Sequence, residues 1–265
     1  MTEPEIQATI KFKVKADHDL TEKAYDVRCT PPDGLPRLNF EQQWVENIPV
    51  YNMRPLLAEL SLDTQGFVAV ELPTKMAYED FFHEEKLRTV YAEEIREYLK
   101  NYLGASCIFF HECVIRKRDK TKRKVDPMNY TLDEVEKLLG QLGGQRLANE
   151  LKTRRFQALN IWKPLREPVK DWPLALCDLR SVDTEDLIPF DEVYIDDVLE
   201  SYQVHYNPNQ KWFYLPEQKS EEVLIFKSAD SSVGGTVPHC SFSNPHSSRD
   251  EPGRESIELR ALVIY

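Results

Sequence analysis

The sequence lacks features that would place it in a membrane or outside the cell. No apolar run approaches the ~18 consecutive residues of a membrane-spanning helix, and the start MTEPEIQ lacks the basic and then apolar order of a secretory signal. We therefore expect a cytoplasmic protein with no membrane partner. The five cysteines are scattered and form no CxxC pair, which argues against a disulfide framework or a zinc site.

An excess of positive charge is also absent. With 34 lysines and arginines against 45 aspartates and glutamates, the chain carries a formal charge of -11, whereas binding to nucleic acid needs a cationic surface. One segment differs, because 116–124 (RKRDKTKRK) holds seven basic residues and one acidic residue. Such a run is most often a solvated loop, and the alternative is a docking segment for an acidic partner. We expect no nucleic acid partner.

Length and composition predict a single domain over 1–265, because 41% of the residues are hydrophobic and can form a substantial core. From Phe156 onward, short strand-like segments divided by Pro, Gly and Asn follow one another without a helix between them. This pattern is typical of an antiparallel sandwich or barrel, so we predict a mainly β protein with flanking helices, built as a jelly roll. The predicted strands cover 7–15, 66–72, 106–115, 156–165, 173–182, 201–207, 211–216, 221–230 and 256–265.

Two segments outside these strands have helical patterns. Apolar residues recur at helical spacing within 78–102, which predicts an amphipathic helix packed on a sheet. Thr131 and Glu134 have the spacing of a capping box and open a second predicted helix over 131–152. Gly143 and Gly144 are expected to break or kink that helix. Both helices should pack outside the sheet.

The last predicted strand places polar side chains on one face. Side chains alternate along a strand, so Ser256, Glu258 and Arg260 share a face with Arg254. A guanidinium beside a hydroxyl suits a dicarboxylate, because arginine pairs with a carboxylate through two charge-assisted hydrogen bonds. Without further information, alternating Arg and Glu are more typical of a solvated sheet face. His239 alone does not indicate a functional site either, since a single histidine is usually a hydrogen-bonded structural residue.

Ordered segments of the C-terminal half look like signature blocks of one family. They are NIWKPL (160–165), PLALCDLRSV (173–182), YNPNQKWFYLP (206–216), EEVLIFKSADS (221–231), PHCSF (238–242) and RESIELRALVIY (254–265). They resemble the fungal hydroxylase/desaturase family of non-haem Fe(II)/2-oxoglutarate-dependent oxygenases, which is similar to the cephamycin hydroxylase component and to the gibberellin desaturase and meroterpenoid endoperoxidase groups. The resemblance implies a double-stranded β-helix, which is another name for the predicted jelly roll.

The resemblance also implies a metal held by a His-x-Asp pair and a distal His, with a cosubstrate carboxylate held by Arg-x-Ser. By position, His239 matches the distal ligand, Arg254 and Ser256 match the cosubstrate clamp, and Arg260 is a further candidate for 2-oxoglutarate binding. Lys163 stands where the family usually carries Arg, and it is the last candidate for this ligand.

The His-x-Asp positions depart from the family pattern. The best match places Pro127 at the histidine and Asn129 at the aspartate. Proline has no donor side chain and asparagine offers a neutral amide oxygen, whereas Fe(II) in this family needs two imidazoles and a carboxylate. Pro127, Asn129 and His239 are therefore predicted to be a degenerate metal site, with no metal and no cofactor bound by this chain. Candidate substitute ligands are Asp126, His111, Glu112, His205 and His246.

These positions lead to several functional hypotheses. The first is a catalytically silent paralogue that forms a heterodimer with a homologous active oxygenase, whose subunit would hold Fe(II), 2-oxoglutarate and a terpenoid substrate. This resembles the paired oxygenases of fungal meroterpenoid biosynthesis of the talaromyolide type. The second is a metal-independent isomerase or cyclase that uses His239, Glu258 or Tyr130 as general acid or base. An active oxygenase with substitute ligands and a plain binding protein complete the alternatives.

Overall fold

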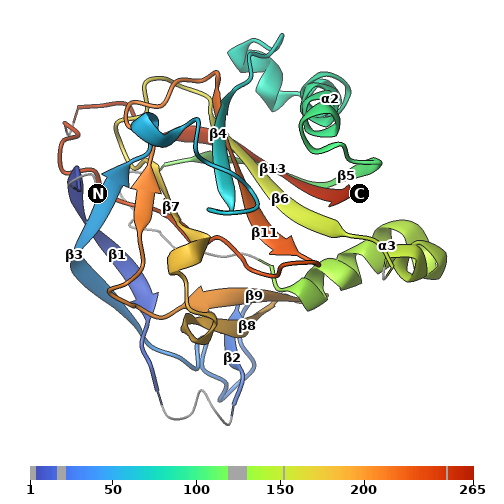
Figure 1. Cartoon of the computed structure of the whole chain (residues 1–265). Helices are drawn as coiled ribbons and strands as arrows, with labels where there is room; N and C mark the ends of the chain where they lie inside the picture. Colours follow the sequence, from blue (N-terminus) through green and yellow to red (C-terminus); the bar gives the residue numbers. More distant parts are fainter. Residues whose placement is uncertain (1–3, 17–21, 119–129, 152, 249) are drawn as a thin grey trace.

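Two packed β-sheets form the body of the molecule (Figure 1). The structure is a computed structural model, and it describes residues 4–16, 22–118, 130–151, 153–248 and 250–265. Its strands are β1 Ile6–Lys13, β2 Ala24–Val27, β3 Gln42–Asn52, β4 Phe67–Glu71, β5 Cys107–Lys117, β6 Phe156–Pro164, β7 Leu174–Cys177, β8 Leu187–Val193, β9 Val198–Val204, β10 Trp212–Tyr214, β11 Glu222–Asp230, β12 His239–Ser241 and β13 Glu255–Ile264.

The strand order confirms the predicted jelly roll. The first sheet has the order β1-β3-β10-β7-β12, and the second has the order β4-β11-β6-β13-β5. All pairs within the second sheet are antiparallel, whereas β3 and β10 pair in parallel in the first. A third, smaller sheet with the order β2-β8-β9 lies beside them, at the bottom of the view in Figure 1. We call it the small sheet.

The two large sheets bury an apolar cluster between them. Leu174 and Leu176 of β7 belong to the same cluster as Trp162 of β6 and Phe226 of β11. Every residue of β6 and β11 is buried, because both faces of the second sheet are covered. The apolar run Val223–Phe226 of β11 follows from this position, since a strand buried on both faces does not alternate.

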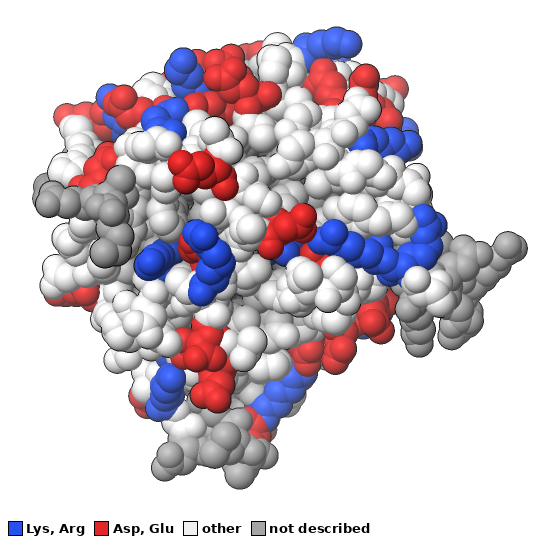
Figure 2. All heavy atoms as spheres, in the orientation of Figure 1, with Lys and Arg blue, Asp and Glu red and all other residues white. Residues whose placement is uncertain are grey.

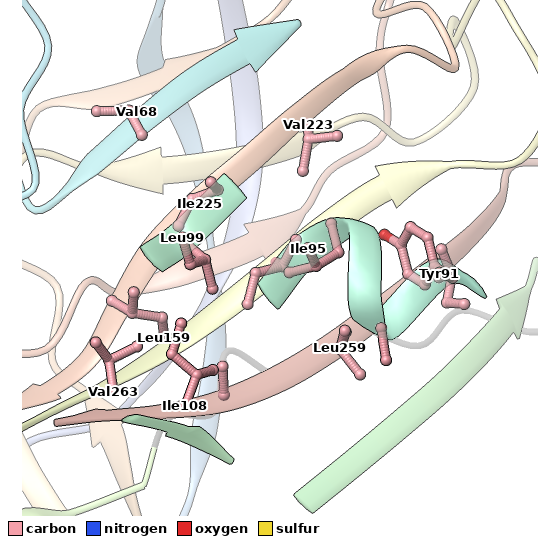
Figure 3. Packing of buried hydrophobic residues seen from close by; sticks show 14 of the residues in the cluster. Val68, Tyr91, Ile95, Leu99, Ile108, Leu159, Val223, Ile225, Leu259 and Val263 are labelled. Carbon is pink, nitrogen blue, oxygen red and sulfur yellow. The ribbon is translucent and has the colours of Figure 1, made fainter. Parts of the chain in front are cut away.

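Helix α2 (Ala92–Leu103) covers the outer face of the second sheet. Its buried residues Ile95 and Leu99 pack with Ile161, Ile225 and other strand residues, as Figure 3 shows for Ile95, Leu99 and Ile225. The predicted continuous helix over 78–102 is wrong in its first part. His83 has an extended backbone (φ -111°, ψ 110°), so the segment is divided into the 3₁₀ helix η3 Tyr78–Phe82, the short α1 Glu84–Lys86, the π-helical turn η4 Leu87–Tyr91 and α2.

Helix α3 (Leu132–Leu151) packs at the end of the second sheet through Val135 and Leu139. Its backbone continues through Gly143 and Gly144, so the predicted break is wrong. Thr131 caps the helix as predicted, because its Oγ1 accepts a hydrogen bond from the Glu134 backbone N–H at 3.2 Å. Glu134 does not complete the capping box, because its carboxylate accepts from the Glu200 N–H of β9 instead.

The remaining helical turns are short. They are η2 Arg54–Leu56, η5 Leu179–Ser181 and η6 Thr184–Asp186. Within the described residues, no helix combines the length and the apolar character needed to cross a lipid bilayer. On the face shown in Figure 2, acidic and basic side chains are interspersed and form no large field of one sign.

Candidate functional site

A cavity of about 960 Å³ opens beside β13. Strands β5, β6, β12 and β13 of the large sheets contribute to its wall, and residues of the small sheet face it from another side. The candidate residues named from the sequence that line it are Glu112, Tyr130, His239, Arg254, Glu258 and Arg260. His239 lies on β12, Glu258 and Arg260 lie on β13, and Arg254 comes directly before β13.

Strand β13 has the alternation predicted from the sequence. Ile257, Leu259 and Ala261 pack in the cluster beneath α2, whereas Glu258 and Arg260 line the cavity on the opposite face. Ser256 belongs to the cavity face by the same alternation and is only 1% exposed. The sequence-based alternative of a solvated sheet face is wrong, because both faces of β13 are covered.

Arg254 and Ser256 each carry a buried polar atom with no hydrogen-bond partner. Arg254 Nη1 donates to the Trp172 carbonyl oxygen at 2.9 Å and to Ser241 Oγ, which fixes the guanidinium. Its Nε and the Oγ of Ser256 are buried and unpartnered in the described structure. A buried polar group without a partner costs roughly 1–3 kcal/mol. Two such donors two residues apart on one face favour binding of an anion.

The electrostatics around Arg254 agree with an anion site. Burial and the neighbouring positive charge of Arg116 lower the pKa of Arg254 to about 10. The guanidinium stays protonated at neutral pH, yet its charge is not neutralised by a carboxylate within ion-pair distance among the described residues. The Arg254 guanidinium carbon Cζ also lies 5.8 Å from the Trp162 ring centroid, so the charged group has an aromatic neighbour.

His239 on β12 is buried and neutral. Its Nδ1 lies 3.3 Å from the Val237 carbonyl oxygen, and its ring lies 4.6 Å from the Phe226 ring centroid. Burial lowers the pKa of His239 to about 4, although the charge of Glu258 opposes this effect. A carbonyl oxygen only accepts hydrogen bonds, so Nδ1 donates and the lone pair lies on Nε2. A neutral imidazole oriented in this way can bind a metal ion.

Arg260 is paired with acidic residues. It lies 2.9 Å from Glu258 on its own strand and 2.9 Å from Glu112 on β5. Although burial opposes it, the charges of Arg260 and Arg116 keep the pKa of Glu258 below its usual value. The Tyr130 hydroxyl donates to Glu112 at 3.2 Å, and burial raises the pKa of Tyr130 to about 12. Arg260 therefore lies in the cavity wall, with its charge already compensated.

The small sheet contributes a polar network that the sequence did not predict. Arg28 pairs with Asp26 at 2.9 Å and with Glu192 of β8 at 3.0 Å. Glu192 also accepts hydrogen bonds from Ser201 and Tyr194, each at 3.2 Å. All five residues line the cavity. Their sequence positions carry no motif, because they meet only where β2, β8 and β9 pair.

Other predicted site residues lie elsewhere. Lys163 is on the opposite face of β6, where its ammonium group lies 5.3 Å from the Phe81 ring centroid beneath the helices. Burial lowers the pKa of Lys163 to about 8. Pro127 and Asn129, predicted as degenerate metal positions, lie outside the described residues, as does Asp126.

The candidate substitute ligands do not gather around His239. His205 Nδ1 bonds the Lys13 carbonyl oxygen at 3.0 Å, and His246 is exposed on a loop. His111 lies beside Tyr130, with 5.9 Å between ring centroids, and its two ring nitrogens have no hydrogen-bond partner among the described residues. Among the residues that the structure describes, no three His, Cys, Asp or Glu side chains lie close enough to hold a metal ion together.

The class defined by these observations is a jelly roll with a cavity lined by the buried Arg254 and the neutral His239, with the buried Ser256 beside Arg254. Comparisons with known proteins give the family. A family model described as "Oxidoreductase/YMDC permease-like domain" matches residues 11–264. The Fe(II)/2-oxoglutarate-dependent dioxygenase nvfI of Aspergillus novofumigatus is 31% identical over 268 residues, which cover 95% of this chain and 94% of that protein.

Two further comparisons agree. The alpha-ketoglutarate-dependent dioxygenase tstK of Talaromyces stipitatus is 32% identical over 265 residues, which cover 89% of this chain and 92% of that protein. The solved structure of the iron and alpha-ketoglutarate-dependent endoperoxidase NvfI superposes with a TM-score of 0.85 at 28% identity, covering 98% of this chain and 97% of that one. The chain therefore belongs to the family of fungal Fe(II)/2-oxoglutarate-dependent dioxygenases and hydroxylase/desaturases.

These relatives correct one prediction. We expected this chain to bind no cofactor and to leave Fe(II) and 2-oxoglutarate to a partner subunit. Relatives that match nearly the whole chain are themselves named as 2-oxoglutarate-dependent enzymes, and nvfI is also named as iron-dependent, which overturns that expectation. The expectation depended on Pro127 and Asn129, whose segment the structure does not describe, so a local sequence match was given too much weight. The interpretation as a silent subunit loses its main support.

Proposed function

We propose that this chain is an Fe(II)/2-oxoglutarate-dependent oxygenase that oxidises a small organic molecule of fungal secondary metabolism. The observation that carries the proposal is the pair of buried donors without a partner in the described structure, Ser256 Oγ on β13 and Arg254 Nε directly before this strand. The names of the relatives that cover nearly the whole chain support the same cosubstrate. The predicted pairing with a homologous oxygenase subunit stays a prediction, because no observation bears on it.

The residues present fit 2-oxoglutarate. Nη1 of Arg254 is fixed by the Trp172 carbonyl, so the guanidinium is oriented before a ligand enters. A carboxylate in the cavity would accept from Arg254 Nε and from Ser256 Oγ, which gives both donors a partner. Trp162 and Trp172 line the same cavity, and their apolar rings would shield this contact from water. Charge-assisted bonds are stronger where water is excluded.

The fit to Fe(II) is partial. His239 offers a neutral imidazole with its Nε2 lone pair available, as a ligand of this metal requires. The acidic residues that line the cavity are Asp26, Glu112, Glu192 and Glu258, and each is paired with an arginine. A complete ligand set does not follow from the described residues, and we derive no reaction step through the metal.

The remainder of the cavity suits an organic substrate. A volume of about 960 Å³ lies at the upper end of the range of small-molecule sites. Its apolar wall comes from Trp162, Trp172, Leu38, Phe40, Leu174 and Leu199, and its polar wall comes from the arginine and acid pairs described above. This chain's own residues would therefore orient a substrate with an apolar body.

Succinate formation tests the proposal. The purified full chain would be loaded anaerobically with Fe(II), mixed with 2-oxoglutarate and oxygen, and analysed for succinate. We expect iron-dependent succinate formation by the wild type and a loss of about thirtyfold or more in Arg254→Gln, because a charge-assisted pair is worth roughly 2 kcal/mol. Succinate that does not depend on iron, or the absence of succinate, would contradict the proposal. A reaction that persists with chelator would instead support the metal-independent isomerase or cyclase.

A further inference from the structure

The residues that line the cavity carry a net positive charge, although the whole chain carries a net negative charge. Its lining contains eight lysines and arginines against four aspartates and glutamates, an excess of four positive charges, whereas the chain as a whole carries -11. Such a difference concentrates anions in the cavity, because low-dielectric walls focus the field of the lining charges. One dianionic cosubstrate at Arg254 does not account for every cation in the wall.

Most of these cations are already compensated by acidic residues. The pairs are Arg28 with Asp26 and Glu192, Arg37 with Asp26, Lys117 with Glu255, Arg118 with Asp171, and Arg260 with Glu112 and Glu258. Arg116 differs from all of them. Among the described residues its side chain lies in the cavity wall without any hydrogen bond or ion pair. Its guanidinium is therefore available to an incoming anion.

The register of the second sheet places Arg116 close to the centre of the site. Arg116 on β5 is directly opposite Ser256 on β13, and paired residues of neighbouring strands project on the same face. Its positive charge acts on His239, Glu258 and Arg254, which surround the site from two strands. Arg116 therefore faces the same space as the anion clamp from the neighbouring strand.

We propose that Arg116 binds a carboxylate of the organic substrate, so that the substrate is an acid with an apolar body. This inference rests on the proposed function, because Arg254 and Ser256 are assigned to 2-oxoglutarate and leave Arg116 for a second anion. The apolar part of the molecule contacts Trp162, Trp172 and Leu174, which line the same cavity. The two anions then bind two separate arginines, 2-oxoglutarate at Arg254 directly before β13 and the substrate carboxylate at Arg116 on β5.

A matched pair of probes tests this inference on the full chain. The probes are 1-naphthaleneacetic acid and its uncharged amide, titrated by calorimetry with 2-oxoglutarate at saturation. We expect the wild type to prefer the acid, and Arg116→Gln to weaken binding of the acid about tenfold through loss of one charge-assisted contact. The affinity of Arg116→Gln for the amide should stay unchanged. Arg88→Gln removes the same charge from an exposed position outside the cavity and should leave both affinities unchanged.

The outcomes separate the two proposals. Equal affinity of the wild type for acid and amide, including no binding of either, would overturn the substrate assignment. Arg116→Gln that weakens 2-oxoglutarate as strongly as the acid would also overturn it, since Arg116 would then belong to the cosubstrate site. Failure of the wild type to bind 2-oxoglutarate would reject the proposed function instead, and the probe pair would still report on Arg116. Thermal unfolding of each variant checks that the fold is kept.

Discussion

At the scale of single residues, unpaired donors distinguish a binding site from a structural cluster. Arg260 forms ion pairs with two carboxylates, whereas Arg254 keeps a buried Nε without a partner. Ser256 is 1% exposed, and its hydroxyl has no hydrogen-bond partner in the part of the chain that the structure describes either. Native proteins leave few buried polar groups unpaired, so such atoms need an explanation. A bound carboxylate gives both donors the same explanation.

Replacing Ser256 tests this explanation, because we expect weaker 2-oxoglutarate binding without a loss of folding stability. Ser256→Ala removes an unpartnered hydroxyl, so the free energy of unfolding should stay the same or rise by up to about 1 kcal/mol. Binding of 2-oxoglutarate should weaken about five- to tenfold, because one donor is lost. Urea unfolding and calorimetric titration measure the two quantities.

Ser201→Ala is the matched control for this prediction. Ser201 is equally buried, but its hydroxyl donates to Glu192 at 3.2 Å. We expect it to lower the free energy of unfolding by about 1 kcal/mol. If Ser256→Ala were destabilising to the same extent with unchanged 2-oxoglutarate binding, Ser256 would be a structural residue.

His239 should give the protein a pH-dependent stability. Its pKa is about 4 in the folded chain, below the ordinary value of 6.5, because burial disfavours the charged ring. Between these values the unfolded chain binds more protons than the folded one. The contribution of a neutral His239 is therefore fully present above pH 6.5 and is lost as the pH falls toward 4. His239→Gln should make unfolding less dependent on pH in this window.

Urea titrations from pH 4 to 7 measure this effect. His83→Gln, at an exposed position, controls for the loss of a histidine. An unchanged pH profile in His239→Gln would show that the ring is not held neutral by the fold. Because His111 also has a pKa lowered to about 4 by burial, some pH dependence should remain in the variant.

At the scale of elements, the packing of α2 on the second sheet should dominate stability. Leu99 is 0% exposed and packs in the cluster with Ile225 and Leu259 (Figure 3). Leu99→Ala should lower the free energy of unfolding by about 3 kcal/mol, because a cavity remains where the side chain was. Lys100→Ala on the exposed side of α2 should change it by less than about 0.5 kcal/mol. Similar losses in the two variants would contradict this packing.

The sequence predicted those strands whose own residues form a clear hydrophobic pattern. β11 contains an apolar run, β13 alternates, and β6 is rich in apolar residues; the sequence predicted all three. β3 and β8 were missed because Pro49 and Pro189 interrupt them, and proline usually argues against a strand. β12 has only three residues and gives no periodic signal. Its existence depends on pairing with β7, which is a tertiary contact.

The site residues also fall into those that the local sequence pattern predicts and those that only the tertiary structure brings together. The shared face of Glu258 and Arg260 follows from alternation along one strand, so the sequence alone predicts it. Arg28 and Glu192 could not be predicted, because 164 positions separate them and only the small sheet brings them together. Lys163 was assigned by resemblance, but the alternation of β6 turns it toward Phe81 of η3 while Trp162 faces the cavity.

At the scale of the whole molecule, the fold and the charge distribution agree on a small anionic ligand. The jelly roll provides rigid strands that hold Arg254 and His239 on opposite sheets, and the cavity lies between these strands. The outer surface in Figure 2 mixes both signs, whereas the cavity has an excess of basic residues. Positive potential is therefore concentrated where the cosubstrate would bind.

The most direct measurement of the central claim is calorimetric titration of the purified full chain with 2-oxoglutarate, with Fe(II) present and oxygen excluded. We expect one binding site per chain in the wild type and an affinity about thirtyfold weaker in Arg254→Gln, whereas Arg88→Gln binds as the wild type does. Binding that is unaffected by Arg254→Gln, or a wild type that does not bind 2-oxoglutarate, would contradict the proposed site.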